Sequence, residues 1–234
     1  MTLPVIHRVT ELDLRFRADS WPFADARRAD IDAHFAEKQR EKPIWNGRIL
    51  LARDPVFTGE RFGACYFEAD FASFLAWRDW GFPDREVFNG FGMGALRCSD
   101  GAFILGEMGQ HTSNAGRIYF PSGTPDLDDL RGGAVDIAGS VAREVEEETG
   151  LTPADYRPSA DWDCVVSGAA IAMIRILDVD TSGEALRARI EANLARQRQP
   201  ELSAIHLVRG VSDLTAAMPR FVTAFVDAQF ASSS

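Results

Sequence analysis

The segment that most constrains this chain is a short acidic stretch, REVEEETGL, at residues 143–151. Asp136 lies at a position suited to cap the start of a helix, and Gly150 is suited to end one. We therefore predict a helix that Asp136 caps, that continues through Thr149 and that stops at Gly150. Because a helix repeats every 3.6 residues, this prediction fixes which acidic side chains share a face.

Three glutamates of the segment fall on one side of the predicted helix. At about 100° per residue, Glu144, Glu147 and Glu148 lie within one arc of about 100°, whereas Glu146 points to roughly the opposite side. Carboxylates crowded on one face repel each other and destabilise the helix. A hard divalent cation relieves that repulsion, and carboxylate oxygens are suitable ligands for Mg²⁺ or Mn²⁺.

An arginine precedes the glutamates and gives the face a cation of its own. Arg143 stands four residues before Glu147, so we expect the two side chains to pair and the arginine to hold the carboxylate in place. A bare acidic run is more often a solvated helix face than a metal site. The interpretation therefore depends on the residues around the run.

Those surrounding residues resemble a known signature. The string REVEEETGL is similar to the second half of the Nudix signature, Arg-Glu-apolar-x-Glu-Glu-x-Gly-apolar, with every fixed position filled. Upstream, the residues from Phe120 to Pro125 resemble the strand and loop that lead into the signature and usually read Pro-Gly-Gly. Gly123 then stands in place of the motif glycine, and the chain is identified as similar to the Nudix hydrolase superfamily.

The first half of the signature departs from the family pattern. The family places a glycine fourteen residues before the arginine and a glutamate eight before it, where this chain has Asp129 and Val135. Gly123 lies twenty residues before Arg143, which indicates a loop expanded by six residues. We predict that Asp126, Asp128 or Asp129 substitutes for the missing glutamate. Ordinary loop chemistry, in which aspartate is common, is the alternative for each.

The resemblance implies a fold and a chemistry. The implied fold class is α/β (α+β), a Nudix-type α/β/α sandwich around a mixed sheet with an N-terminal extension. The implied reaction is hydrolysis of a nucleoside diphosphate linked to another moiety, with Glu144, Glu147 and Glu148 holding Mg²⁺ or Mn²⁺. Arg143 and Glu147 have catalytic roles in this interpretation, and Glu147 is also a candidate for the base that deprotonates water. A homodimer is expected from family habit.

Composition excludes several other classes of protein. The net charge is −10 and no run of Lys and Arg stands out, so we expect no nucleic-acid partner. No apolar stretch approaches the roughly 20 residues of a membrane helix, and residues 1–16 lack the pattern of a secretory signal. The three cysteines are widely spaced and form neither a disulfide framework nor a metal knuckle. We expect a cytoplasmic protein that binds a small molecule and no membrane.

The chain is expected to divide into an N-terminal lobe, residues 1–88, and a Nudix domain, residues 89–234. The strands we predict cover 5–16, 47–53, 63–67, 92–98, 103–107, 117–120, 165–177 and 204–208. The helices we predict cover 23–41, 71–80, 136–149, 183–197 and 212–230, the last with Pro219 as a candidate kink. Residues 121–133 are predicted to be a loop.

The N-terminal lobe and the expanded loop resemble a minority of Nudix proteins that includes UDP-sugar hydrolases. The matching residues are an Asn46-Gly47 turn, an aromatic-rich helix near Trp77, and the string GFGMGAL at residues 90–96. The alternative is a lobe that only packs against the rest. Trp45, Trp77 and Trp80 are candidates to stack on a base, although buried aromatic side chains are the usual case.

Two further groups of residues are candidates for the site. His111 and Arg117 precede the expanded loop and could contact phosphate or sugar; a surface position without function is the alternative for both. Asp161 and Asp163 follow the acidic helix and could supply a base. Because Val135 replaces the loop glutamate, a second function also stays open, namely a Nudix-fold nucleotide-binding or regulatory protein without catalysis.

Overall fold

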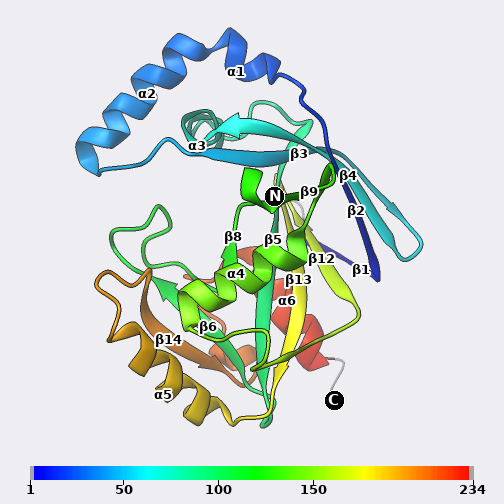
Figure 1. Ribbon diagram of the computed structural model, residues 1–234, viewed down its shortest axis with the longest axis vertical. Coiled ribbons are helices and arrows are strands. Elements are labelled where there is room, and N and C mark those ends of the chain that lie inside the picture. Colours follow the sequence, from blue (N-terminus) through cyan, green and yellow to red (C-terminus); the bar gives the residue numbers. More distant parts are fainter. Residues whose placement is uncertain (1–2, 232–234) are drawn as a thin grey trace.

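The computed structural model of the chain describes residues 3–231 (Figure 1). Its strands are β1 (Val5–Val9), β2 (Glu11–Phe16), β3 (Arg48–Thr58), β4 (Arg61–Asp70), β5 (Val87–Cys98), β6 (Phe103–Met108), β7 (Ile118–Tyr119), β8 (Ser122–Gly123), β9 (Leu130–Arg131), β10 (Ala134–Val135), β11 (Arg157–Pro158), β12 (Trp162–Ser167), β13 (Ala170–Val179) and β14 (Leu202–Val208). Its helices are α1 (Pro22–Ala26), α2 (Arg28–Glu41), α3 (Phe71–Asp79), α4 (Ile137–Thr149), α5 (Gly183–Leu194) and α6 (Arg220–Ala231), with short 3₁₀ turns η1 (Leu127–Asp129) and η2 (Val211–Asp213). Within the described residues, no helix is both long and apolar enough to cross a membrane.

Strand β5 is the centre of the architecture because it pairs with four other strands. It runs parallel to β13 from the Asn89–Ala170 pair to the Cys98–Val179 pair. Along its other edge it meets β3 first, β8 next and β6 last, all antiparallel. The sheet is therefore mixed, and the strands of the N-terminal region are continuous with those of the rest of the chain.

Helices cover both faces of this sheet. On one face a side chain at Gly92 or Gly94 would overlap residues of α4, so these glycines let the helix approach the strand closely. On the other face Phe91 meets Phe221 of α6, with ring centroids 5.5 Å apart. This arrangement confirms the predicted α/β/α layering around a mixed sheet. The glycines of residues 90–96 serve helix packing and a contact with Tyr66, which gives them a structural reason.

The N-terminal sheet has two apolar faces. Phe62 and Tyr66 of β4 belong to the main core, which continues beneath α4 and α6. Phe67, on the opposite face of β4, packs in a second core with Trp77 and with residues of α1 and α2. The predicted boundary at residue 88 lies inside β5, and β1 pairs with β12 of the C-terminal part.

Several predicted elements differ from the structure. Residues 5–16 form two strands, and residues 165–177, predicted as one strand, belong to the β12–β13 hairpin that turns at Gly168 with φ 63°. The last helix begins after Pro219 and is not kinked by it; the Pro219 carbonyl instead accepts from the amide of Val222. A continuous apolar run hides a tight turn, which is why the hairpin was missed.

The expanded loop is also more ordered than predicted. Residues 130–135 form the β9–β10 hairpin, which turns at Gly132 and Gly133, both with positive φ. Strand β10 pairs with β2, since Ala134 faces Arg15 and the amide of Phe16 donates to the Gly133 carbonyl at 2.9 Å. The expansion therefore adds strands to the N-terminal sheet and joins it to the start of α4.

Candidate active site

The acidic helix α4 begins and ends as its sequence predicts. The Asp136 side chain accepts from the amide of Gly139 at 2.9 Å and caps the first turn. Gly150 adopts the left-handed conformation with φ 75° and ends the helix. The motif glutamates consequently occupy the last two turns, beside strand β8.

Strand β8 lies directly against two of these glutamates. The Glu144 carboxylate is so close to Gly123 that a methyl group there would overlap it, which explains why glycine is needed. One turn later, the amide of Ser122 donates to Oε1 of Glu148 at 3.3 Å. The predicted motif glycine and the predicted metal ligands are thus neighbours in space.

The α4 glutamates lack enough positive charge nearby to compensate for the burial of Glu144 and Glu148. Desolvation raises the pKa of Glu144 to about 7, although Arg143 opposes the shift. Glu148 is only 4% exposed, and its burial together with the charge of Glu144 holds its pKa well above the ordinary range. Glu147 is exposed and its charge adds to the repulsion. These side chains would be stabilised as carboxylates by a cation placed among them.

The donor set fits a hard divalent metal in chemistry, since all three groups are carboxylates and the pKa values of Glu144 and Glu148 are raised. In the part of the chain that the structure describes, no three His, Cys, Asp or Glu side chains already converge on a common metal position. Holding a metal would therefore require the exposed Glu147 side chain to turn toward Glu144 and Glu148.

Arg143 has a different partner from the one predicted. Its Nη1 and Nη2 donate to the two carboxylate oxygens of Asp129 at 2.5 and 3.2 Å, and Nη2 also donates to Oε1 of Glu144 at 3.3 Å. Asp129 is 2% exposed. The predicted pairing with Glu147 was wrong because the loop folds back over the helix and supplies a nearer, buried carboxylate.

The loop aspartates mainly organise the loop. The amide of Asp126 donates to Oδ2 of Asp129 at 3.0 Å, and the amide of Asp128 donates to Oδ1 of Asp126 at 2.7 Å. Together these bonds cap the 3₁₀ turn η1. Asp129 is the loop carboxylate that holds the motif arginine, whereas the Asp128 side chain is exposed.

A second group of residues approaches the glutamates from the other side of β8. The charge of Glu201 raises the pKa of both Glu144 and Glu148 after the larger effect of burial. The buried phenol of Tyr119 also feels the charges of these glutamates, and its own pKa is raised chiefly by burial. No pattern in the sequence pointed to Glu201 or Tyr119, because neither belongs to a motif and folding alone brings them near the glutamates.

Of the predicted phosphate contacts, His111 is near this second group. The Glu201 carbonyl accepts from the amide of Gly109 at 2.7 Å, and the His111 ring lies against Gly109. Arg117 is exposed at the end of the same loop.

The other candidates have structural surroundings. Asp163 is buried and accepts from Arg8 at 3.0 and 3.2 Å and from Gln229 at 3.0 Å. Trp77 is fully buried, and its indole N–H donates to the carbonyl of Asp84 at 2.9 Å. Trp45, in contrast, is 86% exposed.

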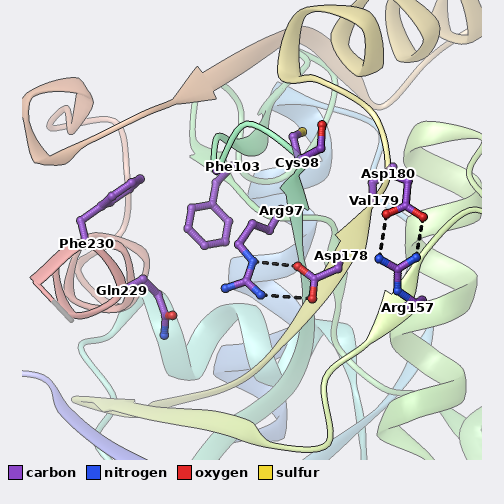
Figure 2. Close-up of a pocket in the computed structure, with 11 residues that line it drawn as sticks. Arg97, Cys98, Phe103, Arg157, Asp178, Val179, Asp180, Gln229 and Phe230 are labelled. Atoms are coloured by element: carbon purple, nitrogen blue, oxygen red, sulfur yellow. Dashed lines mark hydrogen bonds and ion pairs between the residues drawn. The ribbon is translucent and has the colours of Figure 1, made fainter. Parts of the chain in front are cut away.

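Two of the surface cavities lie elsewhere, and the larger of this pair, with a volume of about 470 Å³, is at the carboxyl ends of β5 and β13 (Figure 2). Arg97 there forms a two-bond ion pair with Asp178, and Arg157 forms another with Asp180. The smaller cavity, of about 360 Å³, lies in the N-terminal region. Neither includes an α4 glutamate, and we give more weight to the glutamates because the arginines of the larger cavity already have carboxylate partners.

Comparison with known proteins gives structural neighbours alone. No family model matches the sequence, and no curated protein does. Similar solved structures include a Nudix hydrolase from M. smegmatis, RenU, with 12% identity, 62% of this chain and 84% of that chain covered, and a TM-score of 0.39. They also include the MutT protein from Methanosarcina mazei, with 17% identity, coverage of 62% and 94%, and a TM-score of 0.38.

A third neighbour is a bifunctional NMN adenylyltransferase/ADP ribose pyrophosphatase from Francisella tularensis, with 12% identity, coverage of 66% and 40%, and a TM-score of 0.34. All three TM-scores are below 0.5. The chain itself has helices on both faces of a mixed sheet, with the acidic helix α4 packed against β5.

Proposed function

We propose that the protein is a Mg²⁺- or Mn²⁺-dependent hydrolase that cleaves the diphosphate bond of a nucleoside diphosphate linked to another moiety. The observation that carries this proposal is the pair formed by the half-buried Glu144 and the buried Glu148, which lie one helical turn apart and both have raised pKa values. Burying acidic groups without a matching cation costs stability, so their presence is best explained by a cationic ligand.

The chain's own residues divide the work in this proposal. Glu144, Glu147 and Glu148 would hold the metal, which when bound supplies positive charge for the diphosphate and acidifies a water molecule. Asp129 fixes Arg143, and Arg143 in turn holds Oε1 of Glu144. This chain of contacts keeps one ligand in position before substrate arrives.

The proton of the attacking water needs an acceptor, and two glutamates are suitable. Glu147 is exposed on the motif face and is the acceptor that the sequence predicts. Glu201 approaches the same carboxylates from outside the motif and is the alternative that the structure adds. A carboxylate can accept the proton at either side-chain oxygen, and separate substitutions of Glu147 and Glu201 distinguish them.

The substrate phosphates would lie on the side of β8 where cationic groups are available. His111 and Arg117 belong to the loop between β6 and β7, which meets Glu201 through Gly109. We propose these two residues as phosphate contacts, and Gly123, Asp126 and Asp128 as further residues that border the substrate. Individual replacement of His111, Arg117, Asp126 or Asp128 by alanine should raise KM more than it lowers kcat.

A catalytically inactive nucleotide-binding protein is the second candidate function. Its supporting observations are Val135, which stands where the family has a glutamate, and Asp129, whose carboxylate is fully used by Arg143. In this case the acidic face would bind a metal–nucleotide complex without hydrolysing it.

The deciding experiment is a screen of nucleoside diphosphate derivatives, including nucleotide sugars, with Mg²⁺, Mn²⁺ or a chelator. Product release that needs the metal and is lost in Glu147→Gln supports hydrolysis. Binding by calorimetry without turnover of any substrate supports the inactive candidate. Light scattering of the same samples tests the homodimer that the family resemblance predicts.

A further inference from the structure

Trp45 differs from every other tryptophan of the chain. It is 86% exposed, whereas the other four are buried or half-buried. Two of those four, Trp21 and Trp77, pack against each other in the core beneath α1 and α2. Indole is the largest side chain and usually contributes its area to a core, so leaving it in water forgoes that stabilisation.

The backbone on either side of Trp45 is nevertheless well anchored. The Ile44 carbonyl accepts from Nε2 of Gln39 at 3.1 Å. The Asn46 side chain accepts from the amide of Ala72 at 2.8 Å, and the Gly47 carbonyl accepts from the amide of Phe71 at 2.9 Å. A tryptophan flanked by such bonds is presented to solvent at a fixed place.

That place lies beside the elements that border the glutamates. Before Trp45, the ammonium of Lys42 donates to the carbonyls of Gln110, at 2.9 Å, and Thr112, on either side of His111. After Trp45, the amide of Leu50 donates to the Pro125 carbonyl at 2.7 Å, two residues beyond Gly123. The segment from α2 to β3 thus spans from the β6–β7 loop to the start of the expanded loop (Figure 1).

Charge around the segment suits the phosphate end of a nucleotide. Lys42 forms no ion pair with any carboxylate in the described part of the chain, so its charge is balanced by carbonyl dipoles alone. His111 lies in the β6–β7 loop, between the two residues whose carbonyls accept from Lys42. An exposed aromatic face three residues from a cation without an ion pair, on a segment bonded to both loops that border the site, is a combination that a metal-bound nucleotide can engage at both ends.

We propose that Trp45 is the residue on which the nucleobase of the substrate stacks. This inference rests on the proposed function for the identity of the ligand class, and it adds the residue that recognises the base. Every nucleobase has a π-face, so stacking on Trp45 favours nucleotides over other diphosphates without selecting one base.

Binding to the metal-supplemented protein tests the proposal without requiring turnover. The probes are ADP and UDP, which carry a base, and inorganic pyrophosphate, which does not. Trp45→Ala should weaken ADP and UDP binding about tenfold and leave pyrophosphate binding unchanged, because base–aromatic stacking contributes on this scale. Trp45→Phe should recover most of the affinity, and Val56→Ala, at an exposed apolar position of the β3–β4 hairpin, is the matched control.

The outcomes separate this inference from the proposed function. Selective loss of ADP and UDP binding supports the stacking role even if no substrate is hydrolysed. Equal binding of ADP by wild type and Trp45→Ala overturns it even if the enzyme is active. It is also overturned by equal weakening of pyrophosphate, which would indicate a disturbed segment, or by wild-type protein that binds neither ADP nor UDP.

Discussion

Two acidic regions lie next to each other at the candidate site, and their carboxylates have opposite surroundings. In the expanded loop, the buried Asp129 carboxylate receives two hydrogen bonds from Arg143 and one from the Asp126 amide. On helix α4, the buried Glu148 carboxylate receives one amide bond and faces the charge of Glu144.

The difference between the two regions indicates their roles. A buried carboxylate with an arginine and backbone donors is already stabilised and serves the architecture. A buried carboxylate with raised pKa and too few donors needs a ligand, which is the property expected of a functional group. The loop aspartates therefore organise the helix, and the helix glutamates are the residues expected to act.

The largest expected effect concerns the helix region. Glu147→Gln should keep the fold and lower metal-dependent turnover about 100-fold or more, since one anionic ligand becomes neutral and losing a single preorganised electrostatic contact costs about 10²–10³ in rate. Glu146→Gln is the control, because Glu146 is exposed and points away from the site. Full activity of the Glu147→Gln variant would contradict the assignment of helix α4 as the catalytic region.

The next effect concerns the loop region and is measured as stability. Asp129→Asn should lower the free energy of unfolding by about 2–3 kcal/mol, because Arg143 would lose its charged partner in a partly buried site. Activity should fall too, since Arg143 also holds Glu144. Asp128→Asn, at an exposed neighbour, should leave the free energy of unfolding unchanged; an equally small effect at both positions in a denaturant titration would contradict the architectural role.

The third effect is a pH dependence in the metal-free protein. The pKa of Glu144 rises from 4.5 to about 7 on folding, so between these values the folded state binds more protons than the unfolded state. For this group, stability is then highest below about pH 4.5 and falls by about 3 kcal/mol as the pH rises from 4.5 to about 7. Glu144→Gln should flatten this part of the profile, and Mg²⁺ should restore stability to the wild type alone. A parallel profile for wild type and variant would show that Glu144 does not titrate abnormally.

The smallest change in stability is expected at the contact between the regions. Gly123→Ala places a methyl group against the carboxylate of Glu144, at the end of a flexible side chain that can shift without disturbing the backbone. Stability should therefore change by less than about 0.5 kcal/mol, while turnover falls about tenfold because Glu144 is displaced. Gly92→Ala meets Val141 and Ile137 of α4 instead and should cost about 1–3 kcal/mol through overpacking. Thermal melts and kcat measured together would show whether the two glycines separate in this way.

Prediction from the sequence succeeded where the information is local. The bounds of helix α4 were predicted correctly because its N-cap Asp136, its helical spacing of apolar and acidic residues and its C-cap Gly150 all lie within one short segment. The β12–β13 hairpin was missed because its only local turn signal, Ser167-Gly168, is a short break in a run of largely buried apolar residues. The last helix was predicted to begin at residue 212 but begins at Arg220, because residues 211–213 form the 3₁₀ turn η2.

The sequence by itself determined the motif helix and the face on which Glu144, Glu147 and Glu148 lie, because helix geometry follows from spacing. Only the tertiary structure decided that Arg143 pairs with Asp129, that the expanded loop becomes part of the N-terminal sheet, and that Glu201 approaches the same glutamates. These facts depend on contacts between segments distant in the chain. Such contacts are selected by burial and by competition among charged partners, which no local pattern records.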